Sequence, residues 1–75
     1  MNTNRRKRLR EVLKKLDDAR SEVESVRDEE DEARDNIPES LQDSDRYADS
    51  EEASEAMDTA IDNIEEAITA IEGVV

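Results

Sequence analysis

The sequence contains no cysteine, histidine, tryptophan or phenylalanine, and only one proline, one glycine and one tyrosine. Without cysteine there is no disulfide and no thiol chemistry. Without histidine the chain lacks a common metal ligand and the usual general base of enzymes. No apolar run has the length of a signal-peptide core or a membrane span. These absences predict a non-enzymatic protein without metal or cofactor, located in the cytoplasm and not in a membrane.

Charge is what the sequence has in quantity: 45% of the 75 residues are charged, and the net charge is −12. Residues 1–15 carry seven bases and one acid, whereas residues 16–75 carry four bases and 22 acids. An acidic excess repels nucleic acid and favours basic partners. The composition therefore predicts protein partners, basic ones included, and no nucleic acid. The basic start is open to two interpretations: charge balance within the chain, or a phosphate-binding arm.

Apolar residues recur at alternating steps of three and four on both sides of Pro38, which is the pattern of a coiled-coil seam. We predict a helix over residues 5–36, a turn region over 37–48 and a second helix over 49–73. Pro38 should end the first helix, and Asp49 with Glu52 should cap the second, which Gly73 ends. The first seam is Leu9, Val12, Leu16, Ala19, Val23, Val26, Glu30, Ala33 and Ile37. The second seam is Ser54, Met57, Ile61, Ile64, Ile68, Ile71 and Val75.

The two seams are complementary if the helices run antiparallel, because facing residues then have numbers that add to a constant. Val23 faces Ile64 when that constant is 87. The fold class predicted is all-α, an antiparallel two-helix coiled-coil hairpin. Its core should consist of Val12, Leu16, Val23, Val26, Ile61, Ile64, Ile68 and Ile71. Beside this core we expect the ion pairs Arg20–Glu65, Arg27–Asp58 and Arg34–Glu51.

Towards the turn the predicted core weakens, since Glu30 and Ser54 occupy seam positions there. We expect Glu30 to remain in water. The tip of the hairpin should begin at Pro38, and Ile37, Leu41 and Tyr47 should hold it against the helices. The tip is therefore predicted to be the mobile part of the protein.

A single hairpin has little core, so we expect self-association into a homodimer that forms a four-helix bundle. Small and apolar residues flank the seams where another helix could approach. The predicted oligomer or partner interface consists of Leu9, Leu13, Ala53, Ala60 and Ala67. The alternative is that the alanines are present only as good helix formers.

Two acidic constellations have no pattern that supports a site. The stretch from Asp43 lacks the glycine and glutamate that a calcium loop places at positions six and twelve. Glu65 and Glu66 are adjacent carboxylates, but a narrow hairpin offers no pocket for acid–base catalysis. The acidic surface as a whole is either a solvated face or a mimic of the phosphate array of DNA that occupies a nucleic-acid-binding cleft.

The run NIPESLQ, followed by an acidic spacer and EAMDTAIDNIEEAI, resembles a group of very small acidic helical proteins encoded in bacteriophages and prophages, mainly of Gram-positive bacteria. The resemblance covers about residues 9–72, and residues 36–42 carry it most specifically. The spacer from Asp43 to Glu55 is longer than in that group, and the basic start is unusual for it. The resemblance implies a helical hairpin and a phage accessory role, with no established activity. The sequence therefore favours a non-enzymatic interaction module, with the DNA mimic as the alternative.

Overall fold

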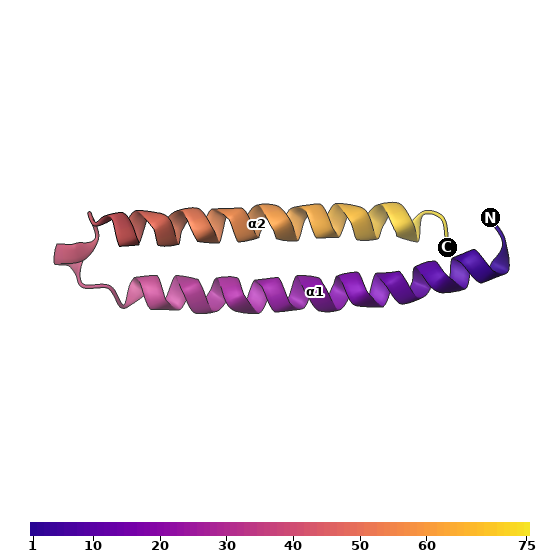
Figure 1. Ribbon diagram of the computed structural model, residues 1–75, viewed down its shortest axis with the longest axis horizontal. Coiled ribbons are helices and arrows are strands. Elements are labelled where there is room, and N and C mark those ends of the chain that lie inside the picture. The colour runs from indigo at the N-terminus through magenta and orange to yellow at the C-terminus, as the bar shows by residue number, and fades with distance from the viewer.

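The computed structural model describes all 75 residues as two long helices joined by a short turn. Helix α1 spans Thr3–Asp35, the 3₁₀ helix η1 spans Glu39–Leu41, and helix α2 spans Asp45–Glu72. Figure 1 shows α1 and α2 running side by side in opposite directions, with both termini at one end. The molecule is a narrow rod of 59 × 14 × 12 Å. The predicted all-α helical hairpin is confirmed.

Local sequence signals account for the helix ends. The Asn2 side chain accepts a hydrogen bond from the backbone N–H of Arg5 at 2.8 Å and so caps α1. α1 ends at Asp35, three residues before Pro38, and Gly73 is the C-terminal cap of α2, as predicted. The predicted start of α2 at Asp49 is wrong. Ser44 is the cap, because its hydroxyl accepts a hydrogen bond from the Tyr47 N–H, and the helix therefore begins four residues earlier.

The seam of α2 follows the prediction. Ile61 is the one buried apolar side chain of the protein, and Ser54 is buried beside α1. The remaining seam residues are half-buried: Met57, Ile64, Ile68, Ile71 and Val75. α2 therefore presents its branched aliphatic residues to α1.

The seam of α1 is rotated from its predicted position. Val12 and Val26, predicted to lie in the core, are 36% and 45% exposed, and Ala19 and Ala33 are exposed as well. The residue after each of these four is half-buried in its place. The observed seam of α1 is Leu9, Leu13, Leu16, Arg20, Val23, Arg27, Glu30, Arg34 and Ile37. Every second contact position on α1 is therefore one residue later than expected.

This rotation brings three arginines against α2. The packing and hydrogen bonding of their side chains explain why the rotated seam is favourable. The side chains of Arg20, Arg27 and Arg34 are 30%, 27% and 15% exposed, so they are progressively more covered towards the turn. An arginine stem is apolar and packs along a helix while its guanidinium extends to a partner. Near the turn, α2 supplies Ser50 and Ser54, whose small side chains leave room for that stem and accept its hydrogen bonds.

At the tip, two predictions need correction. Leu41 is 54% exposed and does not hold the tip, whereas Ile37 and Tyr47 are half-buried. Glu30, expected in water, is half-buried and accepts a hydrogen bond from the Ser50 hydroxyl at 2.6 Å. Polar contacts thus replace the missing apolar ones at this end.

Candidate functional site

A polar cluster joins the helices near the turn, and Arg34 is at its centre. The Nη1 group of Arg34 donates hydrogen bonds to Ser54 Oγ at 2.8 Å and to the backbone oxygen of Ser50 at 3.2 Å. Its Nη2 group donates to Asp31 Oδ1 at 2.9 Å. Ser54 in turn donates to Asp31 Oδ1 at 2.6 Å. One guanidinium thereby links α1 to two buried serines of α2.

The cluster shifts the ionisation of its members. The hydrogen bond from Ser54, followed by the one from Arg34, lowers the pKa of Asp31 below its usual value. The hydrogen bond to Asp31 raises the pKa of Arg34. Both shifts favour the charged forms, so the cluster is held as an ion pair with every buried polar side-chain atom partnered.

The depressed pKa of Asp31 has a consequence for stability. A carboxyl group with a lowered folded-state pKa stabilises the fold above its unfolded pKa, about 3.9 for aspartate, and loses that contribution as the pH falls through the folded value. We expect Asp31→Asn to lower the melting temperature at pH 7, and the difference from wild type to shrink below about pH 4. Thermal melts followed by circular dichroism across pH 2–7 measure this difference. A difference that stays constant down to pH 2 would contradict the assignment.

Of the three ion pairs predicted between the helices, one forms. Arg27 Nη1 contacts Asp58 Oδ1 at 2.9 Å, and this bond raises the pKa of Arg27. Arg20 instead pairs within α1, with Asp17 and Glu24. Arg34 pairs with Asp31 rather than Glu51.

The contacts Arg27–Asp58 and Asp31–Ser54 lie on one side of the hairpin, and that side is acidic. Residues at seven-residue spacing remain on one face of a helix that packs in a coiled coil. The acidic flank defined in this way consists of Asp17, Glu24 and Asp31 on α1, with Glu51, Asp58, Glu65 and Glu72 on α2.

On the opposite side the corresponding positions are uncharged from Val12 to Ala33 and from Ala53 to Val74, and Arg5 and Arg46 precede these two rows. Ala33 of α1 and Ala53 of α2 line one groove there with Ile37, and the rest of its lining is polar: Glu30, Arg34, Arg46, Asp49 and Ser50. The uncharged residues at seven-residue spacing from these two alanines form a set that we call the uncharged face: Val12, Ala19, Val26, Ala33, Ala53, Ala60, Ala67 and Val74. Its three valines are 36–48% exposed. Ala60 and Ala67 are half-buried, and the other members of the set are exposed. A largely exposed apolar strip is unusual in a chain with 45% charged residues.

The basic segment at the N-terminus, residues 5–10, belongs to α1 and forms no ion pair. α1 extends beyond the end of α2 in Figure 1, and residues 1–8 are all exposed. Lys14 and Lys15 form no ion pair either, because every ion pair in the structure involves Arg20, Arg27 or Arg34. The basic segment is therefore free to contact another molecule.

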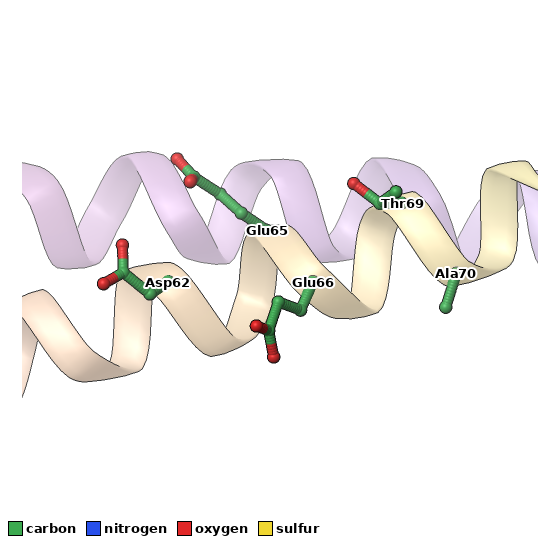
Figure 2. Close-up of a pocket in the computed structure, with 5 residues that line it drawn as sticks. All are labelled: Asp62, Glu65, Glu66, Thr69 and Ala70. Atoms are coloured by element: carbon green, nitrogen blue, oxygen red, sulfur yellow. The ribbon is translucent and has the colours of Figure 1, made fainter.

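One surface hollow of the hairpin is lined mainly by acidic side chains. The hollow in Figure 2 is lined by Asp62, Glu65, Glu66, Thr69 and Ala70, all from α2. Glu65 and Glu66 point in different directions and do not form a carboxylate pair around a common point. No group of three acidic side chains converges as metal ligands would. The stretch from Asp43, considered above as a calcium loop, mostly belongs to the first turns of α2.

The predicted interface residues divide between two places. Ala53, Ala60 and Ala67 lie on the uncharged face, whereas Leu9 and Leu13 are half-buried in the observed seam. Val12, Ala19, Val26 and Ala33, which the sequence assigned to the first seam, also lie on the uncharged face. Repeating the pattern analysis one residue later along α1 would have separated the two strips.

Neither α1 nor α2 has an apolar stretch long enough to cross a lipid bilayer. Comparison of the chain with protein-family models, with curated proteins and with solved structures finds no match.

Proposed function

We propose that this chain is a non-enzymatic protein-interaction module that works as a homodimer, in which two hairpins pack through their uncharged faces into a four-helix bundle. The observation that carries the proposal is the uncharged face itself. It runs along both helices, and it includes three exposed valines. Each helix would then have apolar residues on two adjacent sides, as helices of a four-helix bundle have. One side faces the other helix of the same hairpin, and the other faces the second copy.

The exposed area of the hairpin supports this proposal. The chain exposes 5716 Å², whereas a compact monomer of this mass exposes about 4,700 Å². The excess is about 1,000 Å², and a standard protein interface covers about 800 Å² on each partner. One hairpin therefore has about as much surplus surface as a stable dimer needs to bury.

We expect the wild-type protein to have twice the 8.6 kDa mass of one chain at tens of micromolar. Ala67→Glu places a carboxylate on the uncharged face, where burying an unpaired charge is costly. It should weaken the dimer by about 100-fold or more. Thr69→Glu adds the same charge at an exposed position two residues away and should leave the dimer intact. Light scattering coupled to size exclusion measures the mass of the wild type and of both variants in solution. A monomeric wild type would refute the proposal.

The resemblance of residues 36–42 to small phage-encoded proteins is the basis for placing this module among phage or prophage accessory proteins of the host cytoplasm. The acidic flank supports a second candidate function, a DNA mimic that binds a basic host protein. Its carboxylates are fixed along two helices, which lowers the entropy cost of binding. In that case binding would compete with duplex DNA and weaken steeply with salt. An adaptor that binds through the uncharged face would show little salt dependence.

A further inference from the structure

The face of α1 that points away from α2 carries bases towards its N-terminal end and acids towards its C-terminal end. A second copy of this helix packed antiparallel to it would place its acids beside these bases. The outer neighbours of its valines and alanines, again at seven-residue spacing, are Arg8, Lys15, Glu22 and Glu29, all exposed. The first two are basic and the last two are acidic. From these observations we infer that the occupant of the uncharged face is a second copy of this chain, with its α1 antiparallel to the first. This inference rests on the proposed function and adds the orientation of the partner.

The apolar residues allow a small number of antiparallel registers, and the charges distinguish among them. If facing residue numbers add to 35, the layers are Leu9 with Val26, Val12 with Val23, and Leu16 with Ala19, each occurring twice by symmetry. In the same register Arg8 flanks Glu29, and Lys15 flanks Glu22. The next registers, seven residues away in either direction, place Glu22 against Glu22 or Lys15 against Lys15.

The second helix fits the same two-fold axis. On α2 the corresponding layers are Met57 with Val74, Ala60 with Ile71, and Ile64 with Ala67, whose numbers add to 131. The two-fold axis then passes between residues 17 and 18 of α1 and between residues 65 and 66 of α2. Within one hairpin these positions lie at nearly the same height, because the facing residues Arg34 and Ser50 have numbers that add to 84. Both helix pairs therefore form apolar layers at once.

This orientation also gives the basic segment a partner. Residues 5–10 carry five bases and no acid, and residues 28–35 carry six acids and one base. Within one helix these segments are about 36 Å apart at 1.5 Å per residue, so they cannot meet in one chain. In the antiparallel dimer each basic segment lies beside the acidic segment of the other copy. Opposite charges in that arrangement favour one orientation over others.

A charge-swap experiment tests the orientation. Variant one carries Arg8→Glu and Lys15→Glu, and variant two carries Glu22→Lys and Glu29→Lys. Each alone places like charges against each other, and we expect its dimer to be about 10- to 100-fold weaker than wild type. Mixed together they restore every pair, so a heterodimer should form at close to wild-type affinity. Native mass spectrometry separates the two homodimers from the heterodimer.

The control distinguishes specific pairing from net charge. Variant two lowers the net negative charge, so general repulsion alone predicts a tighter dimer, whereas the proposed register predicts a weaker one. Asp18→Lys with Glu32→Lys makes the same change in net charge at exposed positions of the outer side of α1, and it should not weaken the dimer. If wild type dimerises but variant two does so equally well, the orientation is wrong and the homodimer stands. A monomeric wild type would overturn both.

Discussion

Replacing Ile61 with alanine is expected to lower the free energy of unfolding by about 2–4 kcal/mol. Ile61 is 5% exposed and is the one apolar side chain that the hairpin buries. No second buried apolar side chain is therefore present to compensate for the contacts that its truncation removes. A domain of this size has only a few kcal/mol to lose, and much of the variant should be unfolded at 25 °C. Urea titration followed by circular dichroism at 222 nm measures the loss.

Leu41→Ala is the matched control for this substitution. Leu41 is 54% exposed, so its truncation should change the free energy of unfolding by no more than about 0.5 kcal/mol. Similar losses at both positions would mean that Ile61 is not the centre of the core.

Arg34→Ala is expected to release the turn end of the hairpin while the other end stays closed. The substitution removes the donor shared by Ser50, Ser54 and Asp31, and Asp31 loses its cationic partner. The helices then keep only the hydrogen bonds from Ser50 to Glu30 and from Ser54 to Asp31 at this end. Amide hydrogen exchange in residues 45–54 should become about tenfold faster or more, with little change in residues 61–71. Exchange measured by mass spectrometry after pepsin digestion resolves the two segments.

Arg46→Ala provides the comparison for Arg34. Arg46 is an exposed arginine of the same region and forms no ion pair. It should leave exchange in residues 45–54 unchanged. If Arg34→Ala also leaves it unchanged, the polar cluster does not hold the turn end.

The hairpin could be predicted from the sequence because both helices carry the seven-residue repeat and Pro38 interrupts it. What pattern analysis could not decide is which of two strips on α1 faces α2. Leu9, Leu16 and Val23 belong to both strips, and the choice depends on Val12 and Val26 against Arg20 and Arg27. Counting apolar residues favours the valines, but an arginine stem also packs, and the guanidinium gains acceptors that a valine does not need.

The position of the uncharged face could be predicted only in part, for the same reason. On α2 the apolar seam is unambiguous, so its neighbours Ala53, Ala60 and Ala67 were placed correctly beside it. On α1 the strip that belongs to the uncharged face had been used for the core. The early start of α2 was missed because Ser44 has Tyr47 three residues later in place of Glu or Gln, so it lacks the capping box that Asp49 and Glu52 display.

Only three of 75 residues are buried in the single hairpin, and this determines how the protein responds to temperature. The heat capacity change of unfolding scales with the apolar area that becomes hydrated. For an isolated hairpin that area is small, so its stability curve would be shallow and its melting broad. Association would add apolar area to the transition and couple melting to concentration. A dilute solution of this protein would then lose structure gradually on warming, and a concentrated one would melt sharply at a higher temperature.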